Sequence, residues 1–377
     1  LDDGWFGQRN DDHAGLGDWV ANPERLPNGI KGLSERIEAM GIKFGLWFEP
    51  EMTNKDSDLY RAHPDWILHT PGRNTSHGRY QYVLDFSRKE VVEYIYEMMA
   101  KILSEAKVSY IKWDMNRSIT ECYSVALPAD RQGEVFHRYI LGVYDLYERL
   151  TSEFPEVLFE SCSSGGGRFD PGMLYYAPQG WTSDDSDAIE RLKIQYGTSL
   201  CYPISSMGSH VSVIPNHQVF RKTPLHTRAN VAYFGTFGYE LDLNSLKEEE
   251  IAEVKEQIIF MKKYRKLLQF GDFYRLKSPF EGNETIWMVV SEDKKTAIVG
   301  YYRTLNGVNQ AYSRIKLQGL DPDMLYENIL NKTENYGDEL MNFGLITTDV
   351  TAGEVPGDAT SCTDFESRIY ILKAKEK

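Results

Sequence analysis

Lys112 and Asp114 lie two positions apart in a segment whose residue types could carry out nucleophilic or acid–base chemistry. The segment 110–117 is a β-branched and aromatic run that ends in ionisable groups, which is typical of a buried strand that leads into a functional loop. Because side chains alternate along a strand, Tyr110, Lys112 and Asp114 share one face. Burying two charges is costly unless they pair with each other or with a ligand. The segment alone therefore allows two interpretations, a structural ion pair and a catalytic carboxylate.

A second group of acids lies at residues 184–187, Asp184-Asp185-Ser186-Asp187. Two carboxylates at different strand ends suit glycoside hydrolysis, in which one attacks the anomeric carbon and the other protonates the leaving oxygen and then activates water. Lys112 beside Asp114 favours the ionised form that a nucleophile needs. Like charge around Asp184 favours the protonated form that an acid needs. Asp185 and Asp187 are rival candidates, since all three acids lie within one turn.

Alternating strand and helix patterns must position these groups. The hydrophobic periodicity predicts strands at 43–48, 80–86, 110–114, 157–161, 180–183, 205–208 and 237–241, with residues 1–5 as the end of an earlier strand. It predicts helices at 31–40, 57–63, 87–105, 133–152, 188–200, 224–234 and 247–269. The helix at 87–105 is expected to begin with a capping box of Ser87 and Glu90. About eight alternating strands predict a (β/α)8 TIM barrel, with a doubly wound open sheet as the alternative. A barrel gathers its active site at the carboxyl ends of the strands, where Asp114 and Asp184 both fall.

The pattern changes after Gly271 from helical to alternating periodicity. Runs at 285–290 and 296–303 flank a turn at Asp293-Lys294, which is typical of a hairpin, and further runs follow at 313–317, 345–350 and 367–372. We therefore expect a catalytic barrel over 1–270, with its first strand truncated, and a small antiparallel β-sandwich domain without helices over 277–377. A start at Leu1, without Met or a signal-peptide pattern, leads us to expect that an N-terminal region is missing.

Composition excludes several other function classes. A net charge of −14 repels phosphate backbones, so nucleic-acid binding is not expected. No apolar run approaches the roughly 18 residues of a membrane span. The four cysteines are Cys122, Cys162, Cys201 and Cys362. They have neither close pairs nor metal-ligand spacing, which favours free thiols in a cytoplasmic protein without a metal. The glycine run 165–167 lacks the spacing of a nucleotide-binding loop, so no cofactor is expected.

Several motifs, taken in order, resemble the α-galactosidases of glycoside hydrolase family 36. They are residues 1–7 (LDDGWFG), 17–19 (GDW), 45–52 (GLWFEPEM), 112–117 (KWDMNR), 162–167 (CSSGGG) and 181–187 (WTSDDSD). The resemblance implies a retaining double displacement on α-galactosides such as melibiose and raffinose-type oligosaccharides. It makes Asp114 the nucleophile and Asp184 the acid/base, the first acid of its run.

The resemblance also implies a sugar pocket. It places Asp2 and Asp3 on the galactose hydroxyls O4 and O6. It adds to the pocket Trp47, Arg79, Lys112, Asn116, Cys162, Gly165 and Trp181. Carboxylates aimed at O4 and O6 can reject the glucose epimer, because the wrong sugar leaves buried acceptors unpaired. Tryptophan rings can cover the apolar faces of the sugar. Structural alternatives stay open: core packing for Trp47 and Trp181, a turn for Asp2 and Asp3, and an inert buried thiol for Cys162.

Three alternative functions follow from the same residues. An α-N-acetylgalactosaminidase needs room at the sugar 2-position, where Cys162 and Trp181 would leave little. A galactosyl transferase differs in water access, which the sequence does not show. A non-catalytic sugar-binding barrel would not need both carboxylates. Members of the family usually carry a large N-terminal β-sandwich domain that this chain lacks, and the full-length protein is expected to be a homo-oligomer.

Overall fold

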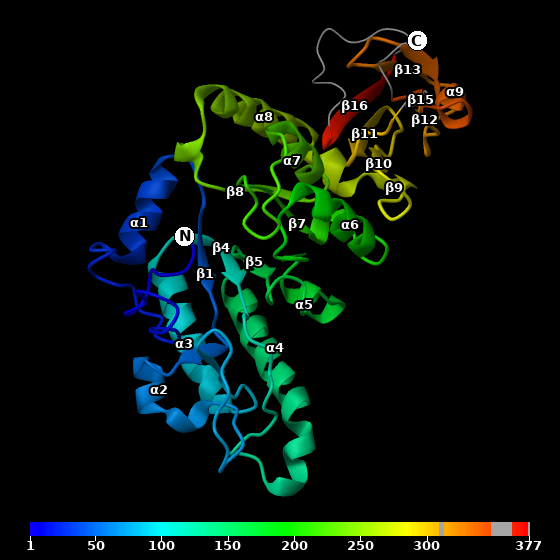
Figure 1. Cartoon of the computed structure of the whole chain (residues 1–377). Helices are drawn as coiled ribbons and strands as arrows, with labels where there is room; N and C mark the ends of the chain where they lie inside the picture. The colour runs from blue at the N-terminus through cyan, green and yellow to red at the C-terminus, as the bar shows by residue number, and fades with distance from the viewer. Residues whose placement is uncertain (309–312, 348–363, 376–377) are drawn as a thin grey trace. The chain divides into compact units, whose positions relative to one another are not determined.

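The computed structural model describes residues 1–308, 313–347 and 364–375 (Figure 1). The chain divides into two compact units, residues 1–181 and 182–377. Each unit is built around its own sheets and its own apolar core. Within the described ranges, no helix has both the length and the apolar character needed to cross a membrane.

A parallel sheet in the order β1-β4-β5-β6 forms the centre of the first unit. Its strands are β1 (Phe44–Phe48), β4 (Val108–Trp113), β5 (Leu158–Ser161) and β6 (Gln179–Gly180). Trp47 pairs in register with Lys112, and Lys112 with Glu160, so these three side chains share one face. Trp113 points to the opposite face, where its ring stacks on Tyr147 with 4.0 Å between ring centroids. The alternation predicted for residues 110–114 is therefore confirmed.

The helix that contains Tyr147 covers the face of this sheet that carries Trp113. The first unit contains five helices. They are α1 (Gly29–Ala39), α2 (Asp58–Ala62), α3 (Lys89–Glu105), α4 (Val135–Glu153) and α5 (Pro171–Tyr176), with 3-10 turns at Pro64–Trp66 and Ala129–Glu134. Helices α3 and α4 run side by side (Figure 1). Val91, Ile95 and Met99 of α3 are fully buried, as expected of residues four apart on one helix face. Helix α5 had not been predicted.

Three details of the first unit differ from the sequence prediction. The strand expected at 80–86 is only β3 (Gln81–Val83), and it pairs antiparallel with β2 (Met52–Asn54) rather than joining the parallel sheet. The capping box is wrong, because α3 begins at Lys89 and the Ser87 hydroxyl donates to Asp85 Oδ1 instead. Residues 1–5 form no strand, although the main-chain N–H of Trp47 donates to the carbonyl of Leu1 at 3.0 Å and holds this segment beside β1.

The second unit begins with a parallel strand pair and three helices. Its elements are β7 (Gly208–Ser212), β8 (Thr236–Glu240), α6 (Ala188–Thr198), α7 (Leu225–Ala232) and α8 (Glu248–Phe270), with 3-10 turns at Ile204–Ser206 and Leu243–Ser245. The strand expected at 205–208 begins only at Gly208, because residues 204–206 form a 3-10 turn. Three glutamates open α8, where negative charge favours the helix N-terminus.

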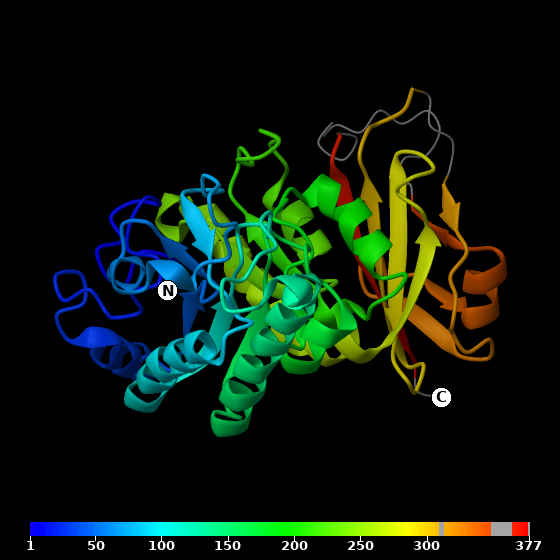
Figure 2. The same cartoon turned by 90° about the horizontal axis from the view of Figure 1, so that it is seen from below.

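A six-stranded antiparallel sheet in the order β14-β13-β16-β11-β10-β9 follows α8. Its strands are β9 (Asp272–Lys277), β10 (Glu284–Val290), β11 (Thr296–Arg303), β13 (Leu325–Asn328), β14 (Glu334–Tyr336) and β16 (Glu366–Ala374), and a separate pair joins β12 (Arg314–Ile315) to β15 (Leu345–Ile346). Figure 2 shows β9, β10 and β11 as adjacent strands. The hairpin predicted at Asp293-Lys294 is confirmed.

The expectation of a helix-free C-terminal region is wrong, because α9 (Gly337–Asn342) lies between β14 and β15. This short helix packs Leu340 into the apolar core of the sheet. Residues 348–350 of the predicted strand at 345–350 lie outside the described residues, as does Cys362. The other three cysteines form no disulfide bond with one another. The segment between the two expected domains, residues 271–276, contains nearly all of β9, which pairs with β10 in the antiparallel sheet. The domain boundary itself stays a prediction.

Candidate active site

Asp114 follows the last residue of β4 and is 7 % exposed. Its Oδ2 accepts hydrogen bonds from Trp47 Nε1 at 3.2 Å and from Asn116 Nδ2 at 2.7 Å. Its Oδ1 accepts from the main-chain N–H of Met115 at 2.9 Å. Donors to both oxygens restrict the orientation of this carboxylate. The structure therefore brings together three of the residues that the sequence predicted for the site.

Asn116 connects Asp114 to a second buried acid, Glu49. The main-chain N–H of Asn116 donates to Glu49 Oε1, and Gln81 Nε2 donates to Glu49 Oε2 at 3.0 Å. Burial, reinforced by the negative charge of Asp114, raises the pKa of Glu49 to about 8. Both effects favour the neutral, protonated form of Glu49. The sequence analysis had not assigned it to the site.

Cys162 and Gly165 belong to a tight loop that follows β5. Gly165 has a φ of +79° and Ser164 a φ of +47°, so the chain turns through two left-handed residues. The loop contacts the site through the Ser164 hydroxyl, which lies 3.5 Å from Asn116 Oδ1. Burial, together with the charge of Asp114, holds the pKa of the Cys162 thiol far above its ordinary value, while the charge of Lys112 opposes this. Cys162 therefore faces Asp114 as a neutral thiol.

The base of this loop is held by a buried ion pair that the sequence analysis missed. Arg168 donates to the carboxylate of Glu51 from both terminal nitrogens, at 2.9 and 2.7 Å, and its Nε donates to Ser163 Oγ at 2.7 Å. Trp113 Nε1 also donates to Glu51, at 2.8 Å. This pair ties the loop to the segment that follows β1. The sequence feature that could have indicated this ion pair is the run Glu49-Pro50-Glu51, which places two acids directly after a buried strand.

Asp2 and Asp3 are exposed beside the end of β1. Asp3 accepts two parallel hydrogen bonds from Arg9, Nε to Oδ1 at 3.0 Å and Nη2 to Oδ2 at 2.8 Å, and the Arg9 side chain is 3 % exposed. Asp2 Oδ1 accepts the main-chain N–H of Asp3 at 2.8 Å. A planar guanidinium fixes the orientation of a carboxylate well. Arg9 had not been predicted, because only the fold brings it beneath Asp3.

The remaining pocket residues differ in exposure. Trp47 and Trp181 are 5 % and 4 % exposed, and Trp47 stacks on Phe6 with 6.2 Å between ring centroids. Trp47 is therefore packed in the core and also belongs to the candidate site, because its Nε1 donates a hydrogen bond to Asp114. Arg79 is exposed, has a φ of +52°, and acts through its charge on Glu49.

Asp184 belongs to the second unit, and its separation from Asp114 stays a prediction. It is exposed, in the turn that leads into α6. Asp187 is 1 % exposed and caps α6, because its Oδ2 accepts the N–H groups of Ile189 and Glu190 at 3.0 and 3.1 Å. It also binds Arg221. These contacts engage Asp187 structurally and leave Asp184 and Asp185 as the candidate acids.

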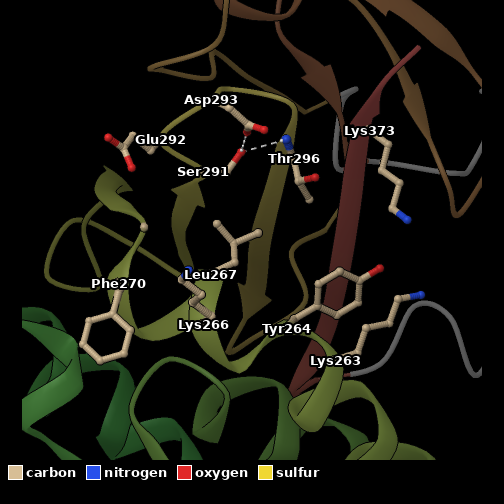
Figure 3. Close-up of a pocket in the computed structure, with 11 residues that line it drawn as sticks. Lys263, Tyr264, Lys266, Leu267, Phe270, Ser291, Glu292, Asp293, Thr296 and Lys373 are labelled. Atoms are coloured by element: carbon tan, nitrogen blue, oxygen red, sulfur yellow. Dashed lines mark hydrogen bonds between the residues drawn. The ribbon is translucent and has the colours of Figure 1, made fainter. Parts of the chain in front are cut away.

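A cavity of about 790 Å³ lies in the second unit, and none of the predicted site residues lines it. Figure 3 shows Tyr264, Leu267 and Phe270 from the end of α8 on one side of it, and the turn of the β10–β11 hairpin on the other. In that turn the main-chain N–H of Thr296 donates to Ser291 Oγ at 3.0 Å, and the Ser291 hydroxyl donates to Asp293 at 2.6 Å. The polar groups of the turn thus satisfy one another.

Two family matches cover the chain. The Melibiase family matches residues 1–271, and the glycosyl hydrolase family 36 C-terminal domain matches residues 284–372. The chain is 56 % identical over 377 residues to the alpha-galactosidase AgaA of Geobacillus stearothermophilus and 49 % identical over 374 residues to the alpha-galactosidase Mel36A of Lactobacillus acidophilus. These alignments take in 100 % and 99 % of this chain but 50 % of each relative. The chain thus spans about half the length of the curated relatives it matches.

Solved structures of alpha-galactosidases are also similar to this chain. A crystal structure of an AgaA variant in complex with raffinose matches with a TM-score of 0.94 and 52 % identity, over 100 % of this chain and 51 % of that chain. The alpha-galactosidase of Lactobacillus brevis matches with a TM-score of 0.96 and 51 % identity, over 100 % of this chain and 50 % of that chain. These likenesses confirm the predicted fold class, a TIM barrel followed by an antiparallel β-domain.

Proposed function

The chain belongs to the Melibiase family of glycoside hydrolase family 36, and on that premise we propose that it carries the active site of a retaining α-galactosidase. We propose terminal α-D-galactosyl residues of melibiose and raffinose-type oligosaccharides as its substrates. The complex of an AgaA variant with raffinose supports this substrate class. Residues 1–270 would form the catalytic barrel and 277–377 the C-terminal β-domain.

The arrangement around Asp114 is the observation that carries this proposal. A nucleophile needs an ionised carboxylate in a dry site with a fixed direction of approach. Asp114 is buried, and Trp47, Asn116 and the N–H of Met115 donate to it. In the proposed first step, an Asp114 oxygen attacks the anomeric carbon while Asp184 protonates the leaving oxygen. In the second step, Asp184 takes a proton from a water molecule, whose oxygen attacks the anomeric carbon and breaks its bond to Asp114, which releases galactose with its original anomeric configuration.

Substrate recognition is proposed to begin at Asp3. Arg9 fixes the orientation of this carboxylate and leaves it partly exposed, with a side-chain exposure of 39 %. An oriented acceptor can bind the axial O4 of galactose and penalise the equatorial O4 of glucose, whose hydroxyl would leave the acceptor unpaired. Asp2 and Asp3 are together proposed to bind the galactose hydroxyls O4 and O6. Arg79, Lys112, Cys162, Gly165 and Trp181 are proposed to complete the pocket.

We also propose that the full-length protein is a homo-oligomer, as its family resemblance implies. A cytoplasmic location is proposed because Cys122, Cys162 and Cys201 form no disulfide bond with one another. Light scattering of the full-length protein measures the oligomeric state. A monomer at micromolar concentration would contradict this expectation.

The experiment that tests the function is turnover of a chromogenic α-galactoside, with NMR detection of the first anomer released. We expect α-galactose as the first product, and no turnover by Asp114→Asn. Release of β-galactose would overturn the retaining mechanism. Faster turnover of an α-N-acetylgalactosaminide, or galactosyl transfer to sucrose that outpaces hydrolysis, would select the corresponding related enzyme. Sugar binding without any turnover would identify a non-catalytic barrel.

A further inference from the structure

Glu49 is a buried acid that the mechanism above does not use. It directly follows β1 and is 1 % exposed. Its two oxygens have different partners, since Oε1 accepts the main-chain N–H of Asn116 and Oε2 accepts Gln81 Nε2 at 3.0 Å. Burying a carboxyl group costs free energy unless hydrogen bonds compensate for the lost water. One of the two hydrogen-bond partners of Glu49 is Asn116, which also binds the proposed nucleophile, so we looked for a role of Glu49 in the reaction.

Asn116 lies between Glu49 and Asp114 and binds both. Its main chain is held by Glu49, and its side-chain Nδ2 donates to Asp114 Oδ2 at 2.7 Å. The neighbouring residue of β1 acts in parallel, because the carbonyl of Phe48 accepts the main-chain N–H of Asp114 at 2.8 Å. Two consecutive residues at the end of β1 thus hold the two residues that define the position of the carboxylate.

We propose that Glu49 is a positioning residue for the nucleophile, holding Asn116 so that its amide donates to Asp114 throughout the reaction. The inference rests on the proposed function of Asp114. It assigns Glu49 no contact with the sugar. Loss of the Glu49 oxygen would leave the N–H of Asn116 buried and unpaired, and the loop after β4 would shift to satisfy it. A displacement of even 1 Å at a reacting group slows a reaction strongly.

The protonation state of Glu49 fits this role. Burial and the charge of Asp114 raise the pKa of Glu49, with the Arg79 charge and the N–H of Asn116 acting in the opposite direction. The neutral form still accepts the N–H of Asn116 and places no second negative charge beside Asp114. Its proton would need an acceptor. Gln81 Oε1 is buried and has no hydrogen-bond partner among the described residues. Rotating the side-chain amide of Gln81 by 180° would place this oxygen beside Glu49, where it could accept the proton.

The experiment compares three variants of the full-length protein with the unsubstituted protein. Glu49→Gln keeps an oxygen for Asn116 without a titrating proton, and Glu49→Leu removes the acceptor. Asp85→Asn is the matched control, because Asp85 is a fully buried acid that binds the hydroxyls of Ser87 and Ser124. For each protein, kcat and KM on an aryl α-galactoside are measured from pH 5 to 9, together with the rate of covalent trapping by a fluorinated galactosyl donor.

We expect Glu49→Leu to lower kcat and the trapping rate about 10- to 100-fold, with KM changed less than about threefold. Glu49→Gln should keep both rates within about threefold at pH 6 and should weaken the fall in kcat/KM between pH 7 and 9. Asp85→Asn should keep kcat. The inference would be overturned if Glu49→Leu kept the kcat of the control, or if Glu49→Gln lost as much as Glu49→Leu. An unsubstituted protein without turnover would overturn the proposed function as well, so the two failures are distinguishable.

Discussion

Arg168 donates to the carboxylate of Glu51 from both terminal nitrogens of its guanidinium, at 2.9 and 2.7 Å. Glu51 is fully buried, and the side chain of Arg168 is 15 % exposed. The pair joins the loop 162–168, which contacts Asn116, to the segment after β1, which contains Glu49. The two segments around the candidate nucleophile are therefore fixed to each other by charge as well as by packing.

Arg168→Leu is expected to destabilise the protein by about 3–5 kcal/mol, because it leaves the charge of Glu51 buried and unpaired. Thermal or urea unfolding measures the loss. The double variant Glu51→Met with Arg168→Leu removes both charges and should recover part of the stability. Equal stability of the single variant and the unsubstituted protein would show that Glu51 is solvated or protonated without Arg168.

Asp114→Gly is expected to lower kcat at least about 10⁴-fold on every α-galactoside, since it removes the proposed nucleophile. Azide should partly restore turnover and yield the β-galactosyl azide, which chromatography and NMR identify. An α-galactosyl azide, or a variant that retains activity, would assign the nucleophile to another residue.

Asp184→Gly is expected to slow melibiose hydrolysis about 10²- to 10⁴-fold, but a dinitrophenyl galactoside far less, because a good leaving group needs no proton. Azide should yield the α-galactosyl azide. Asp185→Gly is the matched control from the same turn and should not show this dependence on leaving group. If Asp185→Gly showed it instead, the acid role would pass to Asp185.

Asp3→Asn is expected to lower kcat/KM by an amount equal to roughly 2–4 kcal/mol of transition-state binding, since it replaces a carboxylate by an amide in the proposed sugar pocket. Asp11→Asn, an exposed acid of the same loop, serves as the control and should keep full efficiency. Unchanged kcat/KM for Asp3→Asn would make the Asp3–Arg9 pair a structural element of the loop only.

Glu49 is expected to make stability fall as pH rises. The folded-state pKa of Glu49 is raised to about 8 from an ordinary value of 4.5, so between these values the unfolded chain has lost a proton that the folded protein keeps. Unfolding thus becomes more favourable by up to a few kcal/mol from pH 4.5 to 8 and levels off above. Glu49→Gln cannot titrate, so its unfolding midpoint relative to the unsubstituted protein should rise across this range. A constant difference from pH 5 to 8 would show that Glu49 has an ordinary pKa.

The sequence by itself determined the local elements and the motifs. The alternation from Tyr110 to Asp114 predicted which side chains share a face, because side-chain direction along a strand is a local property. The hairpin at Asp293-Lys294 was predictable for the same reason. The acids after the strands identified the candidate nucleophile, since a functional group at a strand end is visible in the order of residues.

Only the tertiary structure decided which groups hold those residues. Arg9 binds Asp3 across six positions of an irregular loop. Arg168 binds Glu51 across 117 positions, a contact that no local pattern encodes. Glu49 differs from an exposed glutamate only through its burial beside Asp114, and its raised pKa is a consequence of that burial. Hydrogen bonds and desolvation depend on distance in space, so the partners that position a site emerge only when the strands and loops are brought together.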